Sequence, residues 1–393
     1  MKKFFFLAVA AVIALAACTK NNADTTAYQQ GKVINFNTVA NKATKAPITG
    51  TYYTHDLAPF GVFAYYLASG DWSTSSDNTS AASYMNDVEV RFNTSKYIWA
   101  PHDGTTFVNY YWPLQGKLTF IAYSPKAAAD AEFSTEGELT LKNFEVNTTV
   151  ASQVDLLYSA LNANKTQNES IYTDGSGTAN SNTVANGGSG EGDMGVNIKF
   201  KHALSQIIFK AQAATEVYDA GMSFKINNIT VNAAKTADEM SVTNPTDVQL
   251  ASAITTWTNP KTMTDFEVRG ADFPNDTEAT GSANFLGKTL SAAIGDPLLM
   301  IPTDFGTTTG LSNPSVTIEY TLYRMSPVLN MGKKSVTIYF DDIEDNISQW
   351  QAGMKYEYDL TIDLQKIYFN PTITADWATG GADDIDVPDD ARP

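Results

Sequence analysis

The sequence has very few of the residues that bind metals or form disulfides. Its 393 residues include one Cys and three His, at His55, His102 and His202. Zinc sites need several such ligands at short spacing, and none of the three His has a second His or Cys close by in the sequence. We therefore expect no metal site, no structural disulfide and no cofactor.

Basic residues and long apolar runs are also scarce. Lys and Arg number 26 against 43 Asp and Glu, which gives a formal net charge of −17. Such a chain repels phosphate backbones, so we expect no nucleic-acid partner. The apolar run at residues 4–14 is too short for a comfortable membrane-spanning helix, which needs about 20 apolar residues.

The short motifs of common enzyme classes are missing too. No GxSxG, HExxH or P-loop string occurs, and the GxGxxG string at residues 190–195 follows a low-complexity tract and precedes a strand-like run, which is the wrong context for nucleotide binding. Carboxylates are abundant, so their number alone leaves a glycosidase-type pair open. The motifs therefore point to no particular catalytic site.

The N-terminus is typical of an exported lipoprotein. Two Lys precede the apolar run, and the run leads into Leu15-Ala16-Ala17-Cys18, which resembles a bacterial lipobox. The Cys18 thiol would receive the lipid, and the signal peptide would be cut between Ala17 and Cys18. The alternative is an ordinary secretory signal with an incidental Cys, but the chain's single Cys falls at the lipobox position.

The rest of the chain is dominated by alternation of apolar and polar residues, the pattern of half-buried strands. Short amphipathic helices could form only over Lys126–Glu132 and Val154–Leu161. Many short strands separated by Gly, Pro, Asn and Asp turns are typical of β-sandwiches. The clearest predicted strands are Val33–Phe36, Phe60–Tyr66, Lys117–Tyr123, Val196–Phe200, Gln206–Ala211, Phe224–Val231, Leu298–Ile301, Val316–Leu322, Val336–Phe340 and Lys355–Leu364.

Composition also divides the chain. Residues 173–195 are a Gly, Ser, Asn and Thr tract without an aromatic residue, which favours a linker over a long loop. We expect a signal peptide over residues 1–17, a lipidated tether over 18–31 and an N-terminal domain over 32–195 that ends in this tract. A C-terminal domain over 196–377 and an acidic tail over 378–393 follow. The tail is either a solvated end or a short strand with Ile385 and Val387 on one face.

The ordered set of motifs resembles the fimbrillin family, the subunits of type V pili. The segments that carry this resemblance are DLAPFGVFAY at residues 56–65, YWPLQGKLTFIAYSP at 111–125, DLL at 155–157, FKHALSQI at 200–207, and Trp350, Gly353 and YEY at 356–358, followed by Trp377. Together they cover nearly the whole mature chain. The resemblance implies two transthyretin-like β-sandwich domains in tandem, an all-β fold without a catalytic site, and a surface-exposed lipoprotein of the outer membrane and its fimbriae.

The resemblance also implies a mode of assembly. In polymerising members a protease removes the first strand by cutting after a basic residue, usually Arg, and a C-terminal strand from the next subunit fills the groove. Here the removable strand would contain Val33, Ile34 and Phe36, and the cut would fall between Lys45 and Ala46. Lys stands where Arg is usual, so either the protease accepts Lys or this subunit is never trimmed. The donor strand would contain Ile385 and Val387.

The function expected from the sequence is thus a structural or adhesive fimbrial subunit. Its partners would be other pilus subunits, the outer membrane through the lipid anchor, and host or bacterial surface ligands. The first alternative is a glycan-binding surface lipoprotein of a nutrient-uptake system, because the aromatic clusters at residues 65–66 and 110–112 could stack on sugars. The second alternative is a secreted glycoside hydrolase.

Overall fold

The computed structural model describes residues 33–39, 58–75, 78–96, 98–166, 195–245, 255–268, 285–306, 313–343 and 347–375. Over these residues nearly all regular structure is β-strand, which confirms the all-β class expected from the sequence. Helical structure in this part of the chain is limited to α2 (Thr215–Asp219) and the short 3-10 turns η2 (Lys126–Ala128), η3 (Val150–Ser152) and η5 (Phe340–Asp342). None of the helices in the described ranges is long and apolar enough to cross a membrane.

The first sheet closes on itself. Its strands are β1 (Phe36–Val39), β2 (Phe60–Leu67), β3 (Ala82–Asn93), β4 (Ile98–His102), β5 (Lys117–Ser124), β8 (Leu157–Ser159), β9 (Asn162–Lys165) and β10 (Val196–His202). The strand order is β2-β3-β4-β1-β10-β8-β5-β9, and β5 also pairs with β2 along most of their lengths. Seven of the eight strands therefore form a closed ring, and β9 is appended to β5.

The C-terminal part contains two facing sheets of four strands each. One sheet has the order β16-β11-β19-β20, with β11 (Ser205–Ala213), β16 (Leu298–Met300), β19 (Met354–Ile362) and β20 (Ile367–Ala375). The other has the order β15-β12-β17-β18, with β12 (Met222–Thr236), β15 (Lys261–Val268), β17 (Ser315–Met325) and β18 (Val328–Tyr339). Burial alternates strictly along β19, as expected for a strand with one face on a core. These two sheets form a β-sandwich.

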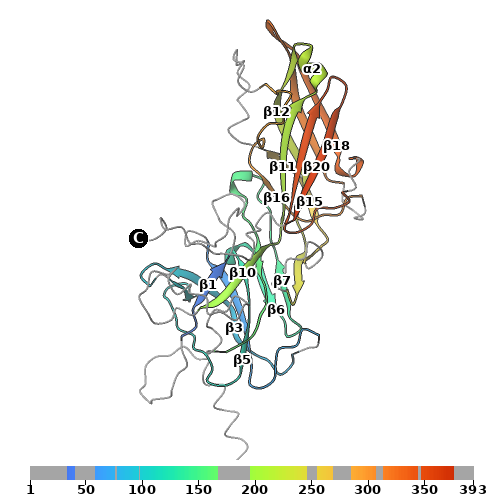
Figure 1. Cartoon of the computed structure of the whole chain (residues 1–393). Coiled ribbons are helices and arrows are strands. Elements are labelled where there is room, and N and C mark those ends of the chain that lie inside the picture. The colour runs from blue at the N-terminus through green and yellow to red at the C-terminus, as the bar shows by residue number, and fades with distance from the viewer. Residues whose placement is uncertain are drawn as a thin grey trace, which may run out of the picture.

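A fourth sheet joins the two parts. It has the order β14-β13-β7-β6, with β6 (Asp130–Phe133), β7 (Glu138–Lys142), β13 (Glu239–Thr243) and β14 (Thr255–Thr258). The central pair, β7 and β13, comes from opposite sides of the tract at 173–195 and is antiparallel over five residue pairs. In Figure 1 strands β6 and β7 of this sheet lie beside the ring strands β1, β3, β5 and β10, and the sandwich strands β11, β12, β18 and β20 form the other end of an elongated molecule.

The buried apolar residues form two separate clusters. The ring interior is one cluster, and every strand of the ring contributes at least one side chain to it; Leu157 comes from β8 and Ile198 from β10. The second cluster begins on the outer face of the ring, at Ile121 and Tyr123, continues across β6 and β7, and runs through the sandwich to Trp350. The ring interior is therefore packed independently of the rest of the core.

Most predicted strands lie where the alternation placed them. The runs at Phe60–Tyr66, Lys117–Tyr123 and Gln206–Ala211 are β2, β5 and β11 to within two residues at each end. The two expected short helices are mostly wrong: η2 covers only the start of the first, before β6, and the second is largely β8 and extended chain. Both segments lie next to long strands, so ladder pairing outweighs their weak helical pattern.

The predicted domain boundary at residue 195 stays a prediction. Residues 167–194 lie outside the described residues, and so does the tail from residue 376 onward. Directly after the tract, β10 pairs with β1 and β8 of the N-terminal ring, and the chain enters the sandwich only with β11. The contacts between the two halves of the sequence therefore include continuous backbone ladders as well as side-chain packing.

In the antiparallel pairing of β2 with β5, Gly61 lies opposite Tyr123, and no room is left for a side chain at Gly61. A Cβ at this position would lie 2.3 Å from the Tyr123 ring and 2.8 Å from the Asp87 carboxylate. The Tyr123 hydroxyl donates to Asp87 at 2.8 Å, and burial, together with this carboxylate, raises the pKa of Tyr123. The ring is therefore held in place and cannot move aside easily.

We predict that Gly61→Ala lowers the free energy of unfolding by about 1–3 kcal/mol, the usual cost of overpacking. The matched control is Gly287→Ala, because the nearest atom to a Cβ at Gly287 is 3.8 Å away. Urea titration followed by Trp fluorescence measures both. Equal stability of the two variants would show that Tyr123 can shift without cost.

Candidate functional site

Strand β1 closes the ring of the first sheet. It pairs in parallel with β10 over four residues, from Phe36 opposite Val196 to Val39 opposite Lys199. On its other side it pairs with β4 in the antiparallel sense, with Phe36 opposite Trp99. Figure 1 shows β1 and β10 side by side at the ring end of the molecule. Without β1, the facing edges of β4 and β10 would both lose their neighbour.

The two residues that β1 and its approach contribute to the ring interior are fully buried. Ile34 is 0% exposed and Phe36 is 2% exposed. The Phe36 ring meets the rings of Phe60 and Phe120 edge to face, with centroids 6.1 Å and 6.0 Å away. Edge-to-face pairs add to the stabilisation that burial alone provides. Phe36 is thus the central ring of an aromatic cluster inside the first sheet.

That cluster continues on both sides of Phe36. Phe60 packs on Trp99 with centroids 5.2 Å apart, and Phe120 packs on Trp112 with centroids 5.6 Å apart. We call the five rings the aromatic row: Trp99, Phe60, Phe36, Phe120 and Trp112. It links β4, β2, β1, β5 and the segment before β5, so removal of Phe36 would interrupt it at its centre.

The backbone before β1 is held by a motif that the sequence analysis singled out. Ile34 N donates to Tyr110 O at 2.7 Å, Val33 forms an isolated antiparallel bridge with Tyr111, and Val196 N donates to Asn35 O at 2.8 Å. The YWP segment, which starts at Tyr111, therefore lies along residues 33–34. Its Trp112 is buried, so that side chain packs in the protein and is not presented as a sugar platform.

The structure places the predicted site residues as follows. The expected strand Val33–Phe36 is a bridge at Val33 followed by the strand Phe36–Val39, so the regular ladder begins later than the apolar pattern indicates. The remaining candidates, Ala17, Cys18, Lys45, Ala46, Ile385 and Val387, lie outside the described residues. Their assigned roles stay predictions.

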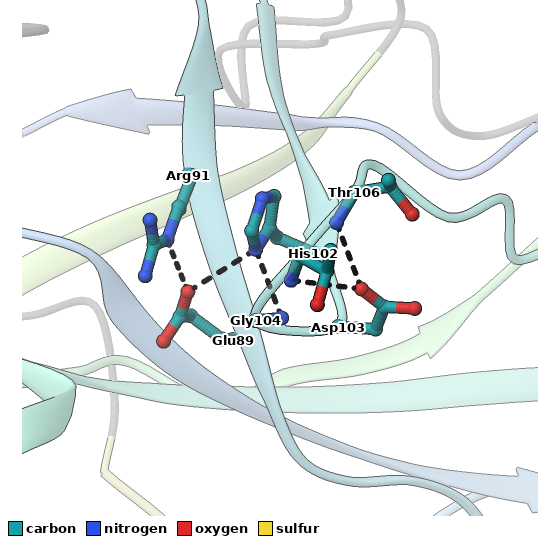
Figure 2. A network of polar contacts seen from close by, with 7 residues as sticks. Glu89, Arg91, His102, Asp103, Gly104 and Thr106 are labelled. Atoms are coloured by element: carbon teal, nitrogen blue, oxygen red, sulfur yellow. Dashed lines mark hydrogen bonds and ion pairs between the residues drawn. The ribbon is translucent and has the colours of Figure 1, made fainter.

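A polar network fixes the end of β4, next to β1 (Figure 2). His102 Nδ1 accepts a hydrogen bond from Gly104 N at 3.0 Å and lies 3.5 Å from Glu89 Oε1, which also binds Arg91. Because Nδ1 is an acceptor here, a neutral ring carries its proton on Nε2. Asp103 Oδ1 accepts from the next two turn amides, at 3.0 Å and 2.8 Å. These bonds order the turn that follows β4.

A second His is buried at the end of β10. His202 Nδ1 lies 2.7 Å from Asp155 Oδ2, and the two side chains are 4% and 5% exposed. The pair ties β10 to the chain just before β8, where the ring meets the larger core. Neither residue was predicted as a site residue from the sequence. The motifs that could have indicated the pair are DLL, which contains Asp155, and FKHALSQI, which contains His202. Both neighbours of β1 are therefore anchored at their ends by His side chains.

The described residues offer no set of three or more His, Cys, Asp or Glu side chains that could hold a metal ion. What the arrangement can do chemically is associate strands. A vacated β1 position would leave unpaired backbone groups on β4 and β10 and would expose the apolar surface that Ile34 and Phe36 cover. An added strand would pair those backbone groups and cover that surface again. The candidate functional site is this position.

Comparison with known proteins identifies relatives of this fold. The profile of a family described as fimbrillin-like matches residues 67–377, which is most of the chain. A search of curated proteins finds no significant match. The family match agrees with the resemblance seen in the sequence motifs.

Solved structures resemble the chain over most of its length. A fimbrial protein from Bacteroides vulgatus is 17% identical and has a TM-score of 0.51, with 87% of this chain and 99% of that chain covered. A candidate cell adhesion protein from Bacteroides ovatus is 16% identical with a TM-score of 0.44, covering 89% and 99%. The tip fimbrial protein Mfa3 from Porphyromonas gingivalis, truncated at its C-terminus, is 9% identical with a TM-score of 0.35, covering 87% and 99%. The first of these likenesses supports the fold.

We predict that Phe36→Ala lowers the free energy of unfolding by about 3–5 kcal/mol, because it leaves a cavity inside the aromatic row. An exposed apolar residue, Leu114, is the control: it is 57% exposed, and Leu114→Ala should change stability by less than about 0.5 kcal/mol. Chemical denaturation measures both variants. A loss below about 1 kcal/mol for Phe36→Ala would mean that β1 adds little to the ring.

Proposed function

The chain belongs to the fimbrillin-like family, and on that premise we propose that it is a structural or adhesive subunit of cell-surface fimbriae. The observation that carries the proposal is the position of β1 between β4 and β10. Fimbrial subunits must join end to end, and a strand position that can be emptied and refilled provides a join without a catalytic group. The protein would act by assembly and binding.

The proposed assembly step is strand exchange at the β1 position. While β1 is covalently attached, its high effective concentration excludes any strand from another molecule. A cut between Lys45 and Ala46 would separate β1 from β2 in the sequence, so that only noncovalent contacts would hold it. Once β1 leaves, Ile34 and Phe36 vacate their pockets, and each such side chain contributes about 1.5–3 kcal/mol by burial. An incoming strand from another subunit restores both the pockets and the ladders.

The proposed route to the surface is lipid attachment. Cys18 would receive the lipid on its thiol, residues 1–17 would be removed, and the tether over 18–31 would connect the lipid to the folded part. The protein would then lie on the outer membrane, with other pilus subunits as partners. The C-terminal tail, with Ile385 and Val387, is the strand that this subunit would offer to a neighbour.

The burial of the Trp side chains argues against the glycan-binding alternative. Trp72, Trp99, Trp112 and Trp350 are buried, and Trp257 is half-buried and donates from Nε1 to Ala203 O at 2.9 Å. Sugar platforms need an exposed ring face, and no Trp among the described residues is exposed. The fimbrial function is therefore preferred.

We predict that Cys18→Ser abolishes lipid attachment, because the Ser hydroxyl does not replace the thiol acceptor. Labelling cells with radioactive palmitate should mark the natural protein and leave the variant unlabelled, with uncleaved precursor accumulating. The control is Ser73→Ala, a change in the folded part that should leave labelling intact. A Cys18→Ser protein that still carries palmitate would contradict the lipoprotein assignment.

We predict that cutting after Lys45 makes β1 exchangeable. Mature protein with a specific protease site between Lys45 and Ala46 should be cut into two pieces that stay together until a competing strand is added. After the cut the melting temperature should depend on protein concentration, because folding has become bimolecular. Mass spectrometry should then detect uptake of an isotope-labelled copy of the residue 18–45 fragment.

The uncut protein is the control for that exchange and should take up no labelled fragment. If the cut protein also takes up none over days and its melting temperature is independent of concentration, β1 is a permanent part of the ring. The chain would then act in the fimbria, if at all, without strand exchange at this position.

A further inference from the structure

The β17–β18 hairpin ends in a group of exposed apolar side chains. We propose that this hairpin end, residues 325–331, inserts into the surface of a lipid bilayer that carries anionic headgroups. The inference goes beyond the proposed fimbrial function and does not depend on strand exchange. It gives the protein a direct contact with the lipid of an opposing membrane.

The exposed apolar side chains lie close together at the start of β18. Val328 and Leu329 are each 47% exposed, and Met331 is 54% exposed. The facing sheet stops short of them: Lys334 Nζ donates to Leu364 O at 3.0 Å, and Leu364 lies in the turn between β19 and β20, where that sheet ends. The first residues of β18 therefore extend past the edge of the sandwich core.

These side chains point to both faces of the hairpin. Val328 pairs with Met325 and Leu329 pairs with Arg324, and successive residues of a strand point to opposite faces. A flat protein surface covers one face of such a ribbon, whereas a lipid layer surrounds both faces. Apolar side chains exposed on both faces therefore favour lipid as the occupant over a protein surface.

The backbone of the hairpin end is suited to a layer without water. The ladder between β17 and β18 continues up to its last pair, Met325 opposite Val328. Only Ser326 and Pro327 lie between these two residues, and Pro has no N–H that would need a partner. Because unpaired backbone groups are costly in lipid, a hairpin with so few of them can enter at low cost.

The charge of the hairpin is opposite to that of the whole chain. Residues 320–340 contain Arg324, Lys333 and Lys334 and no acidic residue, whereas the whole chain has 43 Asp and Glu against 26 Lys and Arg. All three basic residues are exposed. At about 3.4 Å per residue they lie within about 20 Å of Val328, where long basic side chains can reach lipid phosphates once the apolar end is inserted.

Helix α2 lies beside the hairpin end and adds an amphipathic side chain. Tyr218 is 40% exposed, and Lys288 Nζ lies 5.9 Å from the centre of its ring. The acidic residues of α2 are Glu216 and Asp219, and Lys288 pairs with Asp219 at 2.8 Å. Charges more than about 8 Å apart are largely screened at physiological salt. The basic side chains at this end, and not the distant acidic ones, therefore decide its attraction to an anionic surface.

The hairpin end and β1 lie at opposite ends of the molecule. Figure 1 shows α2 at the end of the sandwich that is far from the ring, and Met325 N donates to Gly221 O, just after α2, at 2.8 Å. The proposed lipid anchor precedes β1 in the sequence, so the ring end would face the anchoring membrane. On that premise the hairpin end faces away and meets the membrane of another cell.

A site-specific label tests insertion in the protein from residue 19 onward. This chain keeps every described residue and contains no Cys, so one introduced Cys can carry a polarity-sensitive fluorophore. The label positions are Val328→Cys, Leu329→Cys and, as the matched control near β5, Leu114→Cys, whose natural side chain is 57% exposed. The probe is vesicles of phosphatidylcholine and phosphatidylglycerol in equal parts. We expect a blue shift of the first two labels and none of the third.

Unlabelled variants test the apolar contribution by co-sedimentation with the same vesicles. Val328→Ser together with Leu329→Ser should weaken binding at least about 10-fold, because two apolar side chains no longer enter the lipid. The control pair, Leu114→Ser with Ile373→Ser, removes similarly exposed apolar side chains elsewhere and should bind as the natural protein does. Urea denaturation checks that every variant is folded.

A charge variant tests the headgroup preference. Arg324→Gln together with Lys334→Gln should remove the preference for the mixed vesicles over vesicles of pure phosphatidylcholine. Added salt should remove the same preference in the natural protein, because it screens the attraction between basic side chains and lipid phosphates. A charge variant that keeps the preference would overturn the choice of anionic lipid.

The remaining outcomes decide between lipid and other occupants. Absence of binding to both kinds of vesicle would overturn the proposal and leave the fimbrial function standing. A blue shift at Val328→Cys without one at Leu329→Cys would mean that the hairpin lies flat on the surface. Self-association that the paired Ser variant abolishes would assign the hairpin end to a second copy of this chain. Binding to target cells that is lost after protease treatment of those cells would assign it to a protein partner.

Discussion

The packing of Phe36 between Phe60 and Phe120 is the contact on which the N-terminal ring depends. The ring is closed by β1, a strand of four residues, and by the two buried side chains at positions 34 and 36. Its strand neighbours are much better secured, because β4 also pairs with β3 over five residues and β10 also pairs with β8. A strand with a short ladder therefore completes both the hydrogen bonding and the aromatic interior of the closed sheet.

The division of the apolar core into two clusters limits the consequences of losing that member. The larger cluster runs from the outer face of the ring through the joining sheet of β6, β7, β13 and β14 to the sandwich, and neither Ile34 nor Phe36 belongs to it. The β7–β13 ladder that joins the halves likewise belongs to a different sheet from β1. A strand could leave the ring interior while the sandwich and the connection between the halves stay folded, which is what a subunit needs when it is activated after folding.

Sequence reasoning recovered the strands that alternate cleanly and missed those that do not. The run around residues 355–362 is predicted because its apolar residues all face one core. β3 was missed, because its pairing with β2 contains register shifts near Asp87, a residue with a φ of 50°, and a bulge breaks the period of two. The burial of Ile34 and Phe36 follows from their spacing, but the parallel pairing of β1 with β10, 160 residues later, leaves no local mark in the sequence. For the same reason the polar anchors at His102 and His202 were not expected.

Topology also explains why a single cut would be sufficient. β1 is the first strand of the described chain, so no earlier strand has to be drawn through the sheet for it to leave. Lys45 lies six residues after the last residue of β1, and a break there would separate the four-residue ladder from every later strand of the described residues. A strand in the middle of the sequence would need two cuts, and a longer one would be held by more ladder pairs. The proposed strand exchange therefore requires only the loss of a short ladder and of two buried side chains at the start of the fold.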